Sequence, residues 1–241
     1  GRQTKRWVLV LILSLFLLFH QLDVSLLHPV TTQMLSVLNA RSIWVDPVVT
    51  LSVGVSILFA LLWGYLFDRH SRVRFLALGS FLWGVTSWLV SISPTLATYV
   101  ISSASGGIDN LLASGVYSLV GDYFGSKNRG KIIGLMLVSQ PLALFFVIFI
   151  SNALTQALNW RLLLVMVGVI AFIFSMLINF LLREPKRGAR ERGMTNVTLT
   201  GTYLFDWESA KENLKAPSLM LIFIFSVFGT MPWFVLRVWI S

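Results

Sequence analysis

Three ionisable residues lie inside long apolar stretches of the sequence, where water is scarce. Asp23 and His20 are three residues apart in the first stretch, so a helix would place them on one face. Asp109 lies in a later stretch, SASGGIDNLLASG, whose small residues permit close packing between helices. A charge at the centre of a bilayer costs at least about 2.5 kcal/mol, so such residues are functional candidates. We interpret all three as groups that hold or pass a proton, with buried polar packing as the alternative.

A short polar connection, GYLFDRHSRVR at residues 64–74, lies between two apolar runs at residues 47–67 and 75–92. Two long helices joined by so few residues must be antiparallel neighbours. Gly64 has no side chain, so it would let another helix approach closely, and Asp68 could pair with a base or with a helix N-terminus. The candidate residues of this connection are Gly64, Asp68, Arg69, Arg72 and Arg74.

The residues needed for most other chemistry are missing from the sequence. There is no cysteine, which excludes disulfides, thiolate metal sites and cysteine nucleophiles. The three histidines lack metal-ligand spacing, and there is no Ser–His, HExxH, paired-Asp or CxxC arrangement. We therefore predict no enzyme activity, no catalytic residue, no bound metal and no cofactor.

The elements that would carry these residues are membrane-spanning helices. The chain has 241 residues, of which 56% are hydrophobic and only 12% are charged, where a soluble domain has about a quarter charged. Apolar runs of about twenty residues indicate helices, because barrel strands are half as long and alternate in polarity. We predict an all-α polytopic membrane protein with seven spans, at residues 7–38, 47–67, 73–92, 95–123, 131–158, 160–182 and 218–240.

The basic residues gather on one side of the predicted spans. All but three of the 19 Lys and Arg residues lie before the first span or near the connections after the second, fourth and sixth, the exceptions being Arg41, Arg161 and Arg237. Lys and Arg near span ends stay in the cytoplasm, which predicts a cytoplasmic N-terminus. This placement explains the net charge of +9 without a nucleic-acid partner. The lipid bilayer is the expected partner, and the plasma (inner) membrane is the expected location.

We predict three regions in the chain. They are a six-helix transmembrane bundle at residues 1–182, a cytoplasmic linker at 183–217, and a seventh transmembrane helix at 218–241 that begins a second half. Two readings of the linker remain open. One is a short amphipathic helix that begins near Asp206 and lies on the membrane surface, and the other is a flexible segment.

The connection at residues 64–74 resembles the signature loop of the major facilitator superfamily of transporters. Ser71 replaces the second glycine of that signature, and the matching residues are Gly64, Leu66, Asp68, Arg69, Arg72 and Arg74. The resemblance implies the six-helix N-terminal half of such a transporter plus the first helix of the C-terminal half, whose remainder lies in the same chain or in a separate piece. It also implies that Asp122 can pair with Arg72 and latch the cytoplasmic side as the halves rock.

Further motifs resemble the spinster-type branch of that superfamily, whose members carry lysolipids and sphingoid phosphates. In chain order they are LALGSFLWG, GDYFGSKNRGK, NWR and LLREPKRGARER. The acids that this branch has in spans one and four fall on Asp23 and Asp109, whereas Val24 and Ser103 stand where it usually has arginines. The absence of those arginines favours His20 as a partial replacement.

These resemblances imply a secondary active transporter that works by alternating access. We expect it to be coupled to H+ and to move a lipid-like or amphipathic substrate, such as a lysophospholipid. One alternative is a small-molecule drug or metabolite carrier of the same superfamily. The other, from a different class, is a membrane scaffold or sensor that no longer transports.

Overall fold

The computed structural model describes residues 2–37, 45–109, 112–156, 159–185, 212 and 215–240. All regular secondary structure within these ranges is helical. The chain divides into two compact units, Gly1–Thr198 and Leu199–Ser241.

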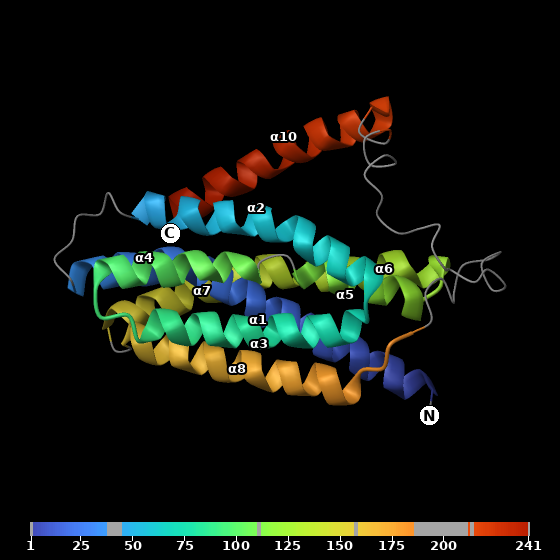
Figure 1. Cartoon of the computed structure of the whole chain (residues 1–241), viewed down its shortest axis with the longest axis horizontal. Helices are drawn as coiled ribbons and strands as arrows, with labels where there is room; N and C mark the ends of the chain where they lie inside the picture. Colours follow the sequence, from blue (N-terminus) through green and yellow to red (C-terminus); the bar gives the residue numbers. More distant parts are fainter. Residues whose placement is uncertain are drawn as a thin grey trace. The chain divides into compact units, whose positions relative to one another are not determined.

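Figure 1 labels the helices of the first unit. They are α1 (Arg2–Val37), α2 (Val45–Arg69), α3 (Arg72–Ser91), α4 (Leu96–Ser105), the 3-10 turn η2 (Gly106–Ile108), α5 (Leu112–Tyr123), α6 (Ser126–Leu137), α7 (Ser139–Gln156) and α8 (Trp160–Leu181). The second unit contains α10 (Pro217–Ile240).

Several of these helices are long and apolar enough to cross a membrane. Among the described residues, five such stretches are Trp7–Leu27, Thr50–Arg69, Arg72–Ser91, Ser126–Ile150 and Trp160–Leu181. Their length and composition confirm the predicted all-α, polytopic membrane fold.

Packing within the first unit brings together helices that are distant in the sequence. α3 packs mainly against α8, while α1 packs against α7 and α8, and α2 packs against α4. The N-terminal end of α1, the α2–α3 and α5–α6 connections and the C-terminal end of α8 lie at one end of this unit (Figure 1). We call it the basic end, because it carries Arg69, Arg72, Arg74, Lys127, Arg129, Lys131 and Arg183.

The fourth predicted span, residues 95–123, is not one continuous helix. The turn η2 interrupts it between α4 and α5. Gly106 and Gly107 form most of this turn, and glycine has a weak helix propensity, so a break costs less here than elsewhere in the span. The prediction of an unbroken span was therefore wrong, and the break lies directly beside Asp109.

The fifth predicted span, residues 131–158, also differs from its prediction, because α6 already begins at Ser126. α6 and α7 meet at Val138, whose N–H bonds a carbonyl three residues back instead of four. Pro141 has no N–H to donate to the Leu137 carbonyl, which explains an irregular turn at this point.

Buried apolar side chains form two clusters along the bundle. The cluster nearer the basic end includes Leu13 and Phe16 of α1, and the other includes Leu26 and Val30 of the same helix. Between the two clusters lies a polar layer, which consists of His20, Asp23, Ser52, Thr86, Ser87, Ser103 and Asp109. Polar groups at this depth must find partners inside the protein, since burying them unpaired costs free energy.

The segment after α8 falls mostly outside the described residues. The predicted surface helix beginning near Asp206 is among the parts not described, apart from Glu212. The domain boundaries at residues 182 and 217 stay predictions.

Candidate functional site

His20 and Asp109 meet in the polar layer. The Nε2 atom of His20 lies 3.3 Å from Oδ2 of Asp109, within ion-pair distance, and the two residues are 4% and 3% exposed. The imidazole also contacts two aromatic rings, stacking on Phe16 at 5.8 Å and meeting Trp83 edge-on at 5.1 Å between ring centroids. The ring is therefore held in place by apolar neighbours while one of its nitrogens faces a carboxylate.

Asp23 has a different partner from the one that the sequence indicated. The indole Nε1 of Trp83 donates a hydrogen bond to its Oδ2 at 2.7 Å. The sequence placed His20 on the same helix face as Asp23, but the imidazole lies against Asp109 instead. Trp83 nevertheless links the two groups, because its ring contacts His20 and its N–H binds Asp23.

A small cavity of about 60 Å³ opens between the two acids. Its polar lining comes from Asp23, Ser52, Tyr99, Ser103 and Asp109 among others. Asp109 Oδ1 is buried and has no hydrogen-bond partner among the described residues. A cavity needs a volume of about 10–15 Å³ to hold one water molecule. This cavity therefore suits a few waters or a small ion rather than a lipid.

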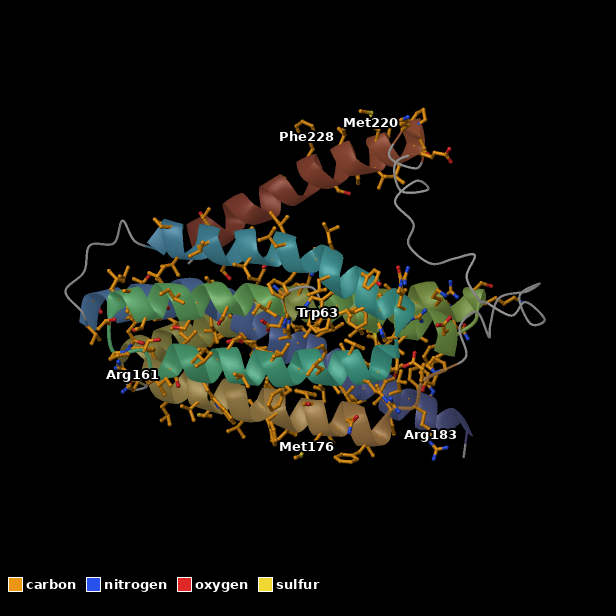
Figure 2. The ribbon with its side chains drawn as sticks, viewed as in Figure 1. Trp63, Arg161, Met176, Arg183, Met220 and Phe228 are labelled. Atoms are coloured by element: carbon orange, nitrogen blue, oxygen red, sulfur yellow. The ribbon has the colours of Figure 1, made fainter. Side chains whose placement is uncertain are left out.

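The break in the fourth span is stabilised by α2. The Trp63 indole N–H donates to the Ile108 carbonyl, a group that the interrupted helix leaves without its usual partner. Gly107 packs directly on the α2 backbone at Ser52 and Ser56, where a Cβ atom would collide with main-chain atoms. Figure 2 labels Trp63 within the first unit. These contacts fix the backbone that carries Asp109.

A second polar group lies at the basic end. The Arg72 guanidinium forms an ion pair with Asp122 of α5, and it also donates to the Ser118 carbonyl at 3.3 Å. The two side chains are only 10% and 12% exposed. The contact that the sequence led us to expect is therefore present, and its role as a latch stays a prediction.

The remaining residues of the 64–74 connection are more exposed. Asp68, Arg69 and Arg74 have exposed side chains, and the Arg69 guanidinium lies 4.8 Å from the centre of the Tyr65 ring. The close helix approach predicted at Gly64 is not seen, since a Cβ atom there would meet no described atom within 4 Å. Gly64 lies on an exposed face of α2, so no helix of the first unit uses the space.

Two residues in these networks escaped the sequence analysis. Glu184 accepts hydrogen bonds from Ser71 Oγ and from the Val73 N–H, both at 2.9 Å, and so caps the start of α3. Trp83 belongs to the motif LALGSFLWG and Glu184 to the motif LLREPKRGARER. Neither motif shows which residue these side chains contact, because the rotation of each helix and the path of each loop decide their partners.

Sequence comparison finds relatives for much of the chain. It is 27% identical over 171 residues to the Xenopus laevis protein spinster homolog 1, covering 69% of this chain and 31% of that protein. It is 27% identical over 154 residues to the Drosophila melanogaster protein spinster, covering 63% of this chain and 25% of that protein. The chain thus spans less than a third of the length of these relatives.

Solved structures share the fold. A bacterial homolog of the human lysosomal transporter spinster, inward-facing and unoccupied, superposes with a TM-score of 0.69 at 18% identity, covering 90% of this chain and 50% of that one. The D-xylose–proton symporter superposes with a TM-score of 0.59 at 17% identity, covering 78% of this chain and 50% of that one. The family model described as Major Facilitator Superfamily matches residues 5–241. This chain is an integral membrane protein that belongs to the Major Facilitator Superfamily, a family of transporters rather than enzymes.

Proposed function

We propose that this chain forms part of a secondary active transporter that works by alternating access and is driven by protons. The observation that carries the proposal is the polar layer, in which His20, Asp23 and Asp109 gather between two apolar clusters. Membership of the Major Facilitator Superfamily supports transport in general. A buried layer of titratable groups supports proton coupling in particular, because such groups are costly inside a membrane.

Two separate positions in the layer would hold protons. The His20–Asp109 pair can hold one exchangeable proton: with it the pair is imidazolium and carboxylate and has no net charge, and without it the pair is neutral imidazole and carboxylate with one negative charge. Asp23 is the second position, and the Trp83 N–H donates a hydrogen bond to its carboxyl group. Opening the cavity to either side of the membrane would then exchange these protons with that side.

The proposed substrate is a lipid-like or amphipathic molecule, on the strength of the spinster-type motifs. The cavity of about 60 Å³ is too small for such a substrate, so we assign it to coupling. The substrate would lie between this half and the second half of the transporter. A small-molecule carrier and a scaffold without transport are the alternatives that substrate assays would separate.

The basic end is proposed to face the cytoplasm, in a plasma or inner membrane. Its concentration of Lys and Arg supports that orientation. Asp68 and the Arg72–Asp122 pair would stabilise one of the two conformations of the transport cycle. Asp68→Asn should then reduce transport much more than it reduces expression, when uptake is compared at matched amounts of protein in the membrane.

Uptake by the full-length protein in proteoliposomes, with and without an imposed pH gradient, tests the coupling proposal. Asp23→Asn should abolish accumulation driven by the gradient, since asparagine cannot titrate. It should keep substrate exchange, because asparagine has similar size and still accepts a hydrogen bond. Glu184→Gln is a matched control that removes an acid at the basic end and leaves the polar layer intact.

Undiminished gradient-driven accumulation by Asp23→Asn would show that the proton does not travel on Asp23. The same measurement on Asp109→Asn and His20→Ala would then test the neighbouring pair. Loss of both exchange and accumulation in all three variants, with normal folding, would favour a structural polar layer over proton coupling.

A further inference from the structure

The cavity in the polar layer is lined by a carboxylate whose hydrogen bonding is incomplete. Asp109 is 3% exposed, and its Oδ2 faces His20, which does not line the cavity. Its other oxygen, Oδ1, is buried and has no hydrogen-bond partner among the described residues. Leaving a buried polar atom unpaired costs free energy, and more so when the group is charged. Oδ1 therefore needs a partner inside the cavity, which is either water or a cation.

The charges around the cavity favour a cation. Asp23 and Asp109 line it from α1 and from the break in the fourth span. No lysine or arginine is among the described residues that line it, and the base that pairs with Asp109 is His20. Two carboxylates and one imidazolium have one net negative charge, which a single monovalent cation neutralises.

The interrupted helix adds backbone polarity of the same sign. α4 ends at Ser105, and the cavity is lined both by Ser103 of its last turn and by Gly106 of η2. The C-terminal end of a helix carries a partial negative charge and carbonyl groups that lack intrahelical partners. The ends of interrupted membrane helices coordinate cations in this way. The break therefore strengthens the attraction that the two acids exert on a cation.

The polar side chains that line the cavity, within the described part of the chain, all end in oxygen. Besides the two carboxylates, hydroxyl groups come from Ser52 of α2 and Ser103 of α4, which are 3% and 2% exposed. Hard cations prefer oxygen ligands of this kind. The volume of about 60 Å³ has room for such an ion together with a few waters. The other lining residues are mostly apolar, so the ion would depend on these protein oxygens.

We propose that this cavity binds one small monovalent cation such as Na+, with Asp23, Asp109 and Ser103 as ligands. The site shares the polar layer with the proposed proton coupling but does not depend on it, because binding at equilibrium needs no transport. Uptake driven by a pH gradient tests the protons, and binding of the cation without a gradient tests this site. The failure of either proposal can therefore be told from the failure of the other.

Binding of radioactive Na+ to the purified full-length protein in detergent, at one fixed pH, tests the site. Choline chloride keeps the ionic strength constant, because choline is too large for a cavity that holds only a few waters. We expect saturable binding of one Na+ per chain. The thermal unfolding temperature should rise with the concentration of Na+ but not with that of choline, since a ligand that binds only the folded state stabilises it.

Two pairs of variants test the ligands. Asp109→Asn removes a charged ligand and should weaken Na+ binding by about tenfold or more, whereas Glu184→Gln removes an acid outside the polar layer and should not. Ser103 and Ser102 are neighbours on α4, but only Ser103 lines the cavity, while the Ser102 hydroxyl meets that of Ser93. Ser103→Ala should therefore weaken Na+ binding, and Ser102→Ala should leave it unchanged.

Three results would overturn the proposal. The first is the absence of saturable Na+ binding by the wild type, which would mean that water alone occupies the cavity. The second is equal Na+ affinity of the wild type and a folded Asp109→Asn variant. The third is equal Na+ affinity of Ser103→Ala and Ser102→Ala, which decides the question if Asp109→Asn does not fold.

Discussion

The indole nitrogen of Trp83 on α3 lies 2.7 Å from Oδ2 of Asp23 on α1, and the ring of the same tryptophan contacts His20. One side chain thus touches both titratable groups that α1 contributes to the polar layer. Because Trp83 is only 1% exposed, its position is fixed by packing, and it in turn fixes theirs.

Replacing Trp83 by phenylalanine should disturb coupling and leave the fold intact. Trp83→Phe keeps an aromatic ring but removes the donor of the hydrogen bond to Asp23. A hydrogen bond to a charged group contributes about 1.5–3 kcal/mol, so the dependence of uptake on pH should differ from that of the wild type. Uptake at a series of pH values measures the change.

Trp88→Phe is the matched control for that variant. Trp88 also lies on α3, and its indole donates to the Val165 carbonyl, away from the polar layer. An unchanged pH profile in both variants would show that the Trp83 hydrogen bond has no part in coupling.

Adding one methyl group at Gly107 should strongly destabilise the protein. A Cβ atom there would collide with the α2 backbone at Ser52 and Ser56, and main-chain atoms cannot move aside as a flexible side chain does. We expect Gly107→Ala to cost about 2 kcal/mol or more, seen as a lower thermal unfolding temperature in detergent.

The adjacent glycine provides a comparison one residue away. A Cβ atom at Gly106 meets no described atom within 4 Å, and the residue has a helical conformation with φ −61°. Gly106→Ala should therefore be neutral, or stabilising by up to about 1 kcal/mol. Equal unfolding temperatures for the two variants would contradict the packing of η2 on α2.

The Arg72–Asp122 pair should show strong coupling in a double-mutant cycle. Removing one partner breaks a mostly buried ion pair, which costs about 3–5 kcal/mol. Arg72→Gln/Asp122→Asn should cost clearly less than the sum of the two single variants, measured as thermal stability. Additive effects would mean that the pair contributes no mutual stabilisation.

Ser71 caps the start of α3, so we predict that different substitutions of Ser71 lower the stability by different amounts. Its Oγ accepts from the Arg74 N–H and donates to Glu184. Ser71→Ala should cost about 1 kcal/mol, and Ser71→Gly, the usual residue of the signature, only a few tenths. Thermal unfolding of these variants beside Glu184→Gln measures the series, and a more stable Ser71→Ala would contradict the capping role.

The sequence by itself determined the class of protein and the presence of several long apolar helices. Long apolar runs and the placement of basic residues need no tertiary information, because the thickness and polarity of the bilayer impose them on any spanning helix. The spacing of the 64–74 connection likewise led to the family, and it led to the contact between Arg72 and Asp122.

Only the tertiary structure decided which residues meet inside the bundle. The sequence put His20 beside Asp23, yet the imidazole faces Asp109, while Asp23 binds Trp83. Lipid is as apolar as a protein core, so periodicity does not reveal which face of a membrane helix turns inward. Each residue turns a helix by about 100°, and that rotation, set by packing on α3 and α8, assigns every polar side chain its partner.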